Sequence, residues 1–349
     1  MEIRKLNALR GIAAIIVMIS HFSNATNLWG GALGKGGGQF GVMLFFILSG
    51  FLMSLLYANK AFTLPQVYRY AVARFARVVP LFLVVVLVSF LLMKLNVTGV
   101  LYNIDSTSEL LAHLLMLSGE SVLWTIPAEI QFYVIFVGLW LLFSRSPKQL
   151  LYTLLVTFML LFYIGYARPI GDVFGMKVDV SIVQSLPYFI VGTLLGHLYH
   201  YIDHFKPYQS HGVLLLLLVV PLLFPQVYQA LSQQTHDLWQ DTGIWLVMTL
   251  IFFAITFLLP DSNPVMSNRV GDFLGKISYS MYLLHMPVLW QIEKLGINSN
   301  ALAFVLFMSA AIFVAWMSYL VIEAPAREGL RRLLAPKPNS QSLAGSKVS

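Results

Sequence analysis

Residues 78–93 read VVPLFLVVVLVSFLLM, a run without a charged side chain. Extended by Lys94 and Leu95, it reaches the length of about 20 mostly apolar residues that a helix needs to cross a bilayer. Similar stretches recur along the whole chain, which predicts an all-α polytopic membrane protein of about ten spanning helices. The predicted spans are residues 7–23, 40–57, 78–95, 124–143, 149–166, 181–199, 212–230, 243–259, 273–292 and 301–322.

The composition excludes the main soluble classes. Of 349 residues, 58% are hydrophobic and 11% are charged, against about 45–50% and 25% in an average globular chain. Such a chain is neither a soluble domain with a polar surface nor largely disordered. The net charge of +7 does not indicate nucleic-acid binding, because the basic residues form no single patch. The absence of cysteine excludes disulfides, thiolate metal sites and a cysteine nucleophile.

The basic residues predict the orientation. With the N-terminus in the cytoplasm, ten spans place 17 of the 22 Lys and Arg residues on the cytoplasmic side, an asymmetry typical of the positive-inside rule. Both termini are then cytoplasmic. The bases left on the outer side are Lys35, Lys94, Arg168, Lys177 and Lys294.

The chain is predicted to form one transmembrane domain, residues 1–334. Residues 335–349 are expected to be a disordered cytoplasmic tail. The apolar run 110–117 is too short to span and is expected at the interface or as a re-entrant segment. The first apolar run resembles a signal peptide, but Arg10 at its start and the lack of a cleavage site favour an uncleaved span.

The first span carries two ionisable residues, Arg10 and His21. Their spacing of 11 positions is three helical turns plus about 20°, which places both on one helix face about 16 Å apart. Arg10 is expected near the cytoplasmic end and His21 in the outer half. Ionisable residues inside spans are functional candidates. The alternative is that Arg10 snorkels to the headgroups while His21 bonds a neighbouring helix.

A basic cluster precedes the third span. Arg74 and Arg77 are neighbours on one helix face, and with Arg10 they could grip phosphate groups through bidentate contacts. The alternative is that these arginines serve only as positive-inside signals.

Two further polar groups fall in the outer halves of spans. Glu129 lies in LWTIPAEIQFY (residues 123–133), with Trp124 and Tyr133 as an interfacial belt or a stacking surface for a sugar. His285 ends LGKISYSMYLLH (residues 274–285), and Tyr282 lies on the way to it. By depth we expect Glu129 and His285 to face one cavity with His21. The alternative for both is hydrogen bonding between helices.

Other patterns are weak. The glycines of GKGGG (residues 34–38) have no phosphate-loop register and indicate a flexible turn. His197, His200 and His204 share a helix face but lie at an inner interface, so we predict no metal site. Among nucleophile motifs, a Gly-x-Ser-x-Gly elbow is missing from the sequence.

Taken together, six blocks resemble the integral-membrane acyltransferase-3 family, whose members include bacterial polysaccharide O-acetyltransferases. LNALRGIAAIIVMISH (residues 6–21) carries that family's Arg-x10-His, and RFARVVP (74–80) its Arg-x-x-Arg. LWTIPAEIQFY resembles its Trp-Ser-Leu-x-x-Glu-x-x-Phe-Tyr run, with Thr125 in place of serine. The remaining blocks are GVMLFFILSGFLM (41–53), LGKISYSMYLLHMP (274–287) and IEAPAR (322–327).

The resemblance implies transfer of an acyl group, expected to be acetyl, from cytoplasmic acyl-CoA to an acceptor at the outer face. Arg10, Arg74 and Arg77 would then bind the donor, and no cofactor is expected to be bound permanently. His21 can take a hydroxyl proton at neutral pH, or can itself carry the acyl group. The other expected catalytic residues are Glu129 and His285, and the expected acceptor-binding residues are Trp124, Tyr133 and Tyr282.

The expected acceptor is a cell-surface carbohydrate or its lipid-linked precursor, and the expected location is the bacterial cytoplasmic (inner) membrane. Some family members carry a fused extracytoplasmic domain that does not follow span ten here, so a partner could complete the transfer. The alternatives are a glycan or lipid transporter or flippase, or a membrane acyltransferase that uses His and Asn in a lipid-facing tunnel. Internal repeats typical of transporters are not visible in the sequence.

Overall fold

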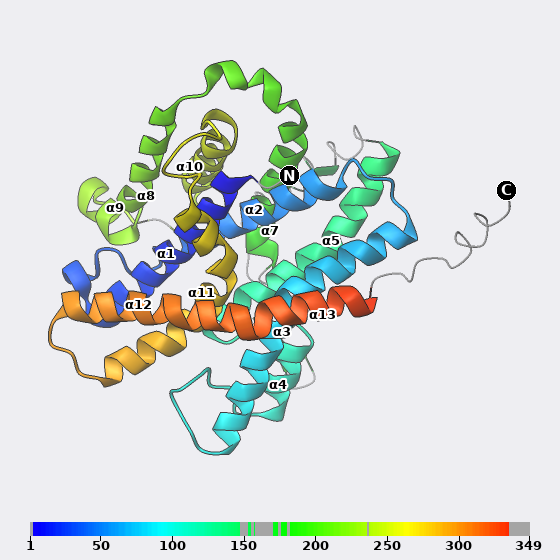
Figure 1. The fold of residues 1–349 in the computed structure, drawn as a ribbon. Helices are drawn as coiled ribbons and strands as arrows, with labels where there is room; N and C mark the ends of the chain where they lie inside the picture. The colour runs from blue at the N-terminus through cyan, green and yellow to red at the C-terminus, as the bar shows by residue number, and fades with distance from the viewer. Residues whose placement is uncertain are drawn as a thin grey trace.

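The computed structural model describes residues 3–146, 153, 154, 157, 170–173, 176–179, 182–235 and 237–334. These residues are mainly helical (Figure 1). The long helices are α1 (Arg4–Thr26), α2 (Gln39–Tyr57), α3 (Leu64–Lys94), α5 (Thr125–Arg145), α7 (Ile182–Leu198), α10 (Thr242–Phe253), α11 (Arg269–Lys294), α12 (Asn300–Ser318) and α13 (Ala324–Leu334). Strands β1 (Ile170–Val173) and β2 (Met176–Asp179) form an antiparallel hairpin.

Short helices connect these elements. They are η1 (Leu28–Gly31), α4 (Thr107–Leu114), η2 (Ser121–Trp124), η3 (Tyr199–His204), η4 (Lys206–Tyr208), η5 (His211–Leu218), α8 (Val219–Leu222) and α9 (Pro225–Ser232). Two π-helical turns, η6 (Ala254–Leu258) and η7 (Tyr319–Glu323), extend α10 and α12.

The described part of the chain contains 6 helices long and apolar enough to cross a membrane, or up to 7 if a bent pair counts as one span. This identifies a multi-pass membrane protein, while the count of ten and the cytoplasmic termini stay predictions. The six correspond to the predicted spans at 7–23, 40–57, 78–95, 124–143, 181–199 and 301–322.

The other predicted spans have different outcomes. Residues 212–230 form two helices bent by 84° rather than one straight span, and Pro221 and Pro225, which lack a backbone N–H, lie at the break. The span at 243–259 is a shorter apolar helix, Thr242–Leu258. Helix α11 is long but too polar to pass the same test. The predicted span 149–166 and the tail 335–349 lie outside the described residues, apart from residues 153, 154 and 157.

Helix α3 begins well before its apolar run. It starts at Leu64, so Arg74 and Arg77 belong to a continuous 31-residue helix rather than to a loop. The arginine end of α3 is therefore rigid, and its two guanidinium groups are held on one face.

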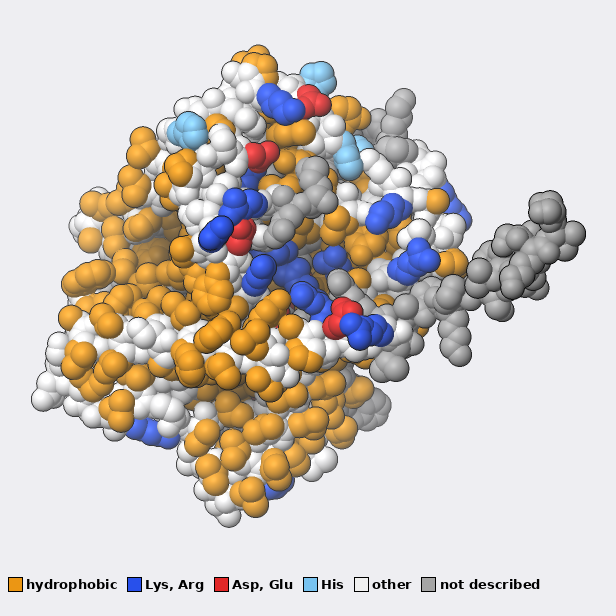
Figure 2. Space-filling view, in the orientation of Figure 1, with side chains coloured by type: hydrophobic (Ala, Val, Ile, Leu, Met, Phe, Trp, Pro, Cys, Tyr) orange, Lys and Arg blue, Asp and Glu red, His pale blue; other side chains and the backbone are white. Residues whose placement is uncertain are grey.

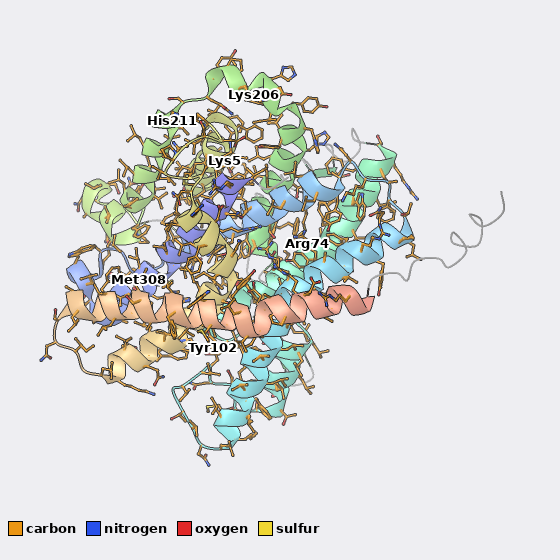
Figure 3. All side chains as sticks on the ribbon, in the orientation of Figure 1. Lys5, Arg74, Tyr102, Lys206, His211 and Met308 are labelled. Carbon is orange, nitrogen blue, oxygen red and sulfur yellow. The ribbon has the colours of Figure 1, made fainter. Side chains whose placement is uncertain are left out.

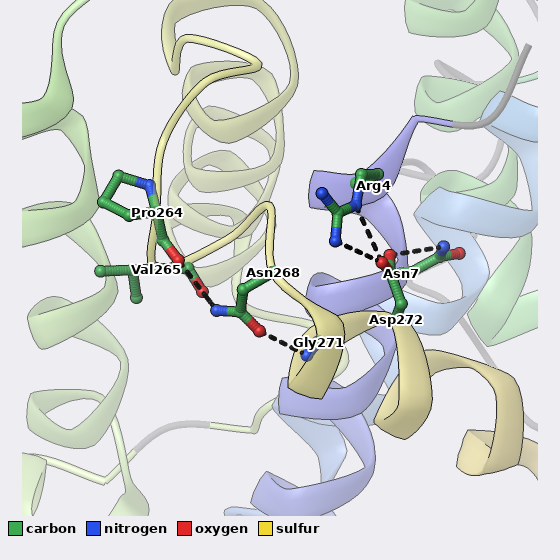
Figure 4. A network of polar contacts seen from close by, with 7 residues as sticks. All are labelled: Arg4, Asn7, Pro264, Val265, Asn268, Gly271 and Asp272. Atoms are coloured by element: carbon green, nitrogen blue, oxygen red, sulfur yellow. Dashed lines mark hydrogen bonds and ion pairs between the residues drawn. The ribbon is translucent and has the colours of Figure 1, made fainter.

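Helices α1 and α11 pack side by side and in parallel, and this pair positions most of the candidate site. At their N-terminal ends, Arg4 and Asn7 both bind the carboxylate of Asp272 (Figure 4), with an Arg4–Asp272 distance of 2.7 Å. Further along, a Cβ added to Gly11 would lie 2.7 Å from the Leu274 Cβ, so only glycine permits this approach. The two helices thus stay in contact along their length.

Apolar surface faces outward on two long helices. Exposed hydrophobic side chains cover the outer faces of α3 and of the α12–η7 helix, and Figure 2 shows hydrophobic surface over the region of α12. Such unpaired apolar surface is expected where lipid replaces water. Examples are Val84, Leu87, Val88, Leu91, Phe313, Leu320 and Val321.

The segment between α3 and α5 is bonded onto α11. The hydroxyl of Tyr102 (Figure 3) donates to the carbonyl oxygen of Leu283 over 2.6 Å. Pro287, four residues later, has no N–H to offer this carbonyl, so Tyr102 satisfies it instead. The hydroxyl of Tyr282 donates to the carbonyl of Val122 at 3.0 Å. The segment is therefore held against α11 beside His285.

Candidate functional site

The centre of the site is a pair of histidines from the two parallel helices. His285 Nε2 lies 3.0 Å from His21 Nδ1, and the ring centroids are 5.0 Å apart. His285 is fully buried, whereas His21 is partly exposed to a cavity. Sequence alone placed the two residues at similar depth; the structure brings them into contact.

The hydrogen bonds of His285 determine which nitrogens carry protons. Its Nδ1 lies 2.8 Å from the carbonyl of Tyr282 and 3.2 Å from that of Met281. A carbonyl only accepts, so Nδ1 of His285 is the protonated nitrogen and its Nε2 accepts in the neutral ring. His21 Nδ1 must then donate to His285. This leaves Nε2 of neutral His21 with a lone pair that can take a proton.

His21 lines an outer cavity. Trp124 of η2 and Tyr282 of α11 line the same cavity, together with Gln39 at the start of α2. The polar groups on its walls suit a hydroxyl-bearing ligand, since hydroxyls both donate and accept hydrogen bonds. Two of the three residues predicted to contact the acceptor thus share a cavity with His21.

Glu129 lines a second, middle cavity and not the outer cavity, which differs from our expectation. It accepts a hydrogen bond from the hydroxyl of Ser49 and another from Tyr133 at 2.8 Å. Tyr133 is 2% exposed and bonded to Glu129, so it supports this carboxylate. Residue counting gave the depth of Glu129 but not the direction in which its side chain points.

A third, basic cavity contains the predicted donor-binding arginines. Arg10, Arg74 and Arg77 line it, together with Arg327 and Glu323. Arg74 is buried, with its guanidinium 5.7 Å from the centre of the Tyr57 ring (Figure 3). Figure 2 shows Lys and Arg side chains gathered near the middle of one face, beside hydrophobic surface. Within the described residues, the buried Nε atoms of Arg10 and Arg74 have no hydrogen-bond partner.

The three cavities are neighbours in space. Arg10 and Arg77 line both the basic and the middle cavity. Val42 and Tyr282 line both the middle and the outer cavity. The middle cavity, which Glu129 lines, thus lies between the basic cavity and the outer cavity.

Sequence reasoning missed Glu323. It is 4% exposed, lies in the π-helical turn η7, and accepts a hydrogen bond from Ser280 at 3.4 Å. Single π-turns are often found at functional sites. The sequence feature that could have identified Glu323 is a carboxylate at the end of an apolar run, inside the block IEAPAR.

The candidate metal cluster on α7 and η3 receives no support. The rings of His197 and His200 are 6.3 Å apart between centroids. Across the described parts of the chain, groups of three or more His, Asp or Glu side chains suited to a metal ion are not found.

Comparison with known proteins identifies the family of the chain. A family model described as an acyltransferase domain matches residues 3–320. A protein of Staphylococcus aureus strain COL, provisionally named an O-acetyltransferase, is 26% identical over 376 residues, covering 94% of this chain and 58% of its own. The O-acetyltransferase OatA of S. aureus strain MRSA252 is 24% identical over 370 residues, covering 96% of this chain and 59% of its own.

The chain thus spans somewhat more than half the length of the curated relatives it matches. No solved structure matches it significantly.

Proposed function

The chain belongs to the acyltransferase-3 family, and from that premise we propose that it is an O-acyltransferase. The proposed donor is cytoplasmic acyl-CoA, with acetyl as the transferred group. The proposed acceptor is a hydroxyl of a cell-surface carbohydrate or of its lipid-linked precursor. The observation that carries the proposal is the contact between His285 and His21. His21 lines the outer cavity, which borders the middle cavity, and the middle cavity borders the basic cavity lined by three arginines.

The basic cavity is the proposed donor site. Guanidinium groups bind phosphates through paired N–H donors, and the unpartnered Nε atoms of Arg10 and Arg74 supply such donors. Along α1, Arg10 and His21 are about 16 Å apart, a span that an extended thioester arm can bridge. Glu129 lines the intervening cavity with an apolar wall that includes Phe45 and Leu52.

The proposed reaction is a direct transfer. Nε2 of His21 takes the proton of the acceptor hydroxyl as its oxygen attacks the thioester carbonyl. The tetrahedral intermediate then collapses, the carbon–sulfur bond breaks, and the CoA thiolate receives the proton from His21. His285 holds His21 in the required tautomer and accepts a hydrogen bond from the imidazolium while it exists. The role of His285 is thus positioning and electrostatic, whereas Glu129 is proposed to act electrostatically from the middle cavity.

The proposed location is the cytoplasmic membrane of a bacterium. The arginine cavity would face the cytoplasm, where acyl-CoA is made, and the outer cavity would face the acceptor. The longer relatives support a further proposal, that another domain or a partner protein takes part after the group has reached the outer face.

The test uses purified protein in lipid vesicles, acetyl-CoA labelled on the acetyl group, and glycans extracted from a deletion strain. We expect label in the glycan, one CoA released for each acetyl transferred, and neither in His21→Gln. Glycan that crosses the vesicle membrane without becoming labelled would identify a carrier and refute the proposal. Label retained on the wild-type protein without acceptor, and lost in His21→Gln, would replace direct transfer by an acyl-histidine. Mass spectrometry of surface glycans from the deletion strain identifies the natural acceptor.

A further inference from the structure

The outer cavity contains a polar group to which the proposed reaction gives no task. Gln39 is the first residue of α2 and lines this cavity with His21. Its Oε1 atom is buried, and among the described residues it has no hydrogen-bond partner. Buried amide oxygens in folded proteins are nearly always hydrogen-bonded. Gln39 lines the cavity and its amide oxygen is unused, so a turn of this side chain toward the cavity would offer an acceptor to a ligand that donates a hydrogen bond.

Gln39 does not contribute to the fold through its side chain. Its backbone N–H donates to the carbonyl of Gly36 at 2.9 Å, which closes the turn into α2. The side-chain amide is not used for capping this helix. Loss of the amide should therefore leave the helix start intact.

The glycine turn before Gln39 explains why Gln39 lines the same cavity as His21. A Cβ on Gly38 would lie 3.3 Å from the Cβ of Ser20 and 3.4 Å from the Cα of Val17, so the turn packs directly on α1. Ser20 precedes His21, just as Gly38 precedes Gln39. The close approach of these two backbones places the imidazole and the amide on the same cavity.

The turn is also held in place. The Oδ1 atom of Asn24 accepts a hydrogen bond from the backbone N–H of Lys35 at 2.6 Å. Gly36 has φ +97°, a conformation that side-chain-bearing residues rarely adopt. The amide of Gln39 is thus presented on a fixed backbone, and little ordering is needed when a ligand binds.

We propose that Gln39 is a specificity-determining residue that accepts a hydrogen bond from a second hydroxyl of the acceptor sugar. This proposal rests on the proposed function. A sugar ring carries hydroxyls on neighbouring carbons, and one of them donates to Nε2 of His21 as it reacts. A neighbouring hydroxyl donates to Oε1 of Gln39. Together the two contacts fix the orientation of the ring and so select which hydroxyl is acylated.

A site built to bind a hydroxyl discriminates strongly against a ligand that lacks it, because its own polar group is then left unpaired. The ligand class is therefore a carbohydrate with a free hydroxyl beside the one that is acylated. A glycan whose neighbouring position is blocked or lacks oxygen should be a poor substrate.

The experiment compares Gln39→Met, which keeps the length of the side chain but removes both polar atoms, with the wild-type protein. Acetyl transfer from labelled acetyl-CoA to deletion-strain glycan gives KM for the glycan and kcat. Mass spectrometry of the product gives the position of the acetyl group. Gln226→Met is the matched control, because Gln226 lies near the same outer turn at Gly31 but does not line the outer cavity.

We expect Gln39→Met to raise KM for the glycan about 2- to 13-fold, the equivalent of one hydrogen bond worth about 0.5–1.5 kcal/mol. The acetyl group should also spread over more than one hydroxyl. Affinity for acetyl-CoA should stay unchanged, and Gln226→Met should behave as the wild type. Gln39→Glu, which keeps an accepting oxygen, should restore a single acetylation position.

Several results would overturn the inference. Unchanged KM and unchanged acetyl position in Gln39→Met, with wild-type transfer intact, would reject the role of Gln39 alone. If that variant no longer binds acetyl-CoA, Gln39→Asn takes its place, since it shortens the arm by one methylene and should show the same two changes. A wild-type protein that transfers no acetyl group to glycan would reject the proposed function and this inference with it.

Discussion

Replacing His285 distinguishes two roles that a histidine beside a catalytic base can have. It can accept a hydrogen bond from the base, or it can itself exchange protons. In His285→Phe an aromatic ring remains next to Tyr282, whose centroid lies 6.0 Å away. The hydrogen bond between the two histidines is lost, which leaves His21 bonded to the backbone of Val17. That hydrogen bond spans 3.0 Å and is made to a ring that becomes charged during the reaction. Hydrogen bonds to charged groups are worth about 1.5–3 kcal/mol, so kcat should fall about 13- to 160-fold.

In His285→Gln the accepting atom is kept. The terminal amide of glutamine occupies roughly the place of the imidazole Nε2, and its oxygen can accept from His21. We expect kcat of this variant to fall by less than about tenfold, because the residue at position 285 needs only to accept a hydrogen bond and not to titrate. In His21→Gln, kcat should fall about 100- to 10,000-fold, which is the usual contribution of a general base to the rate.

The assay is the initial rate of acetyl transfer to deletion-strain glycan, with the affinity for acetyl-CoA measured separately by calorimetry. His197→Phe is the matched control, since His197 lies on α7 and lines none of the three cavities. If His285→Gln is as inactive as His21→Gln while acetyl-CoA still binds, His285 itself exchanges protons. The reasoning from the tautomers would then be refuted.

Four further predictions concern the donor site, the topology and the outer segment. Arg77→Ala should weaken acetyl-CoA binding about 13- to 160-fold, because one charge-assisted contact is lost. Arg269→Ala, a control at an exposed position, should bind acetyl-CoA as the wild type does. If calorimetry gives Arg77→Ala the same affinity as the wild type, Arg77 serves only as a topology signal. Arg74→Ala should weaken binding similarly and also lower the unfolding temperature, because this buried side chain packs against Tyr57; an unchanged temperature would contradict that packing role. A C-terminal reporter active only outside the cytoplasm should stay silent, and a signal would mean that one span is miscounted. Burial lowers the pKa of His113, whose Nε2 accepts a hydrogen bond from the Glu120 N–H at 2.8 Å. Below pH 6.5 the unfolded segment therefore binds more protons than the folded one, so the stability of this segment decreases as the pH is lowered. Hydrogen exchange at Glu120 should then accelerate on acidification, beyond its intrinsic pH dependence, in the wild type but not in His113→Gln.

The common face of Arg10 and His21 could be predicted because it depends only on helix geometry. The contact between His21 and His285 could be expected only as a similarity in depth. It depends on the close approach of α1 and α11 at Gly11, and helix packing is not written in the local sequence. Residue counting likewise gave the depth of Glu129, but the cavity it faces depends on the neighbours Ser49 and Tyr133.

Gln39 and Glu323 were missed for different reasons. A glutamine after a run of glycines looks like part of a polar turn, and only the packing of that turn on α1 makes it part of a cavity. Glu323 follows an apolar span where a helix end is expected, and the π-helical turn that orients it has no simple sequence pattern. The bend in residues 212–230 could have been predicted from Pro221 and Pro225.

The wall that Val42 and Tyr282 form between the middle and outer cavities has an electrical consequence. A continuous aqueous pore through a bacterial membrane would let ions run down the membrane potential, which is worth about 2.3 kcal/mol per elementary charge per 100 mV. The hydroxyl of Tyr282 donates a hydrogen bond to the carbonyl of Val122, which holds this residue at the boundary of the two cavities. A thioester arm that moves this ring aside fills the opening it makes. On this route the membrane stays insulated while a chemical group crosses it.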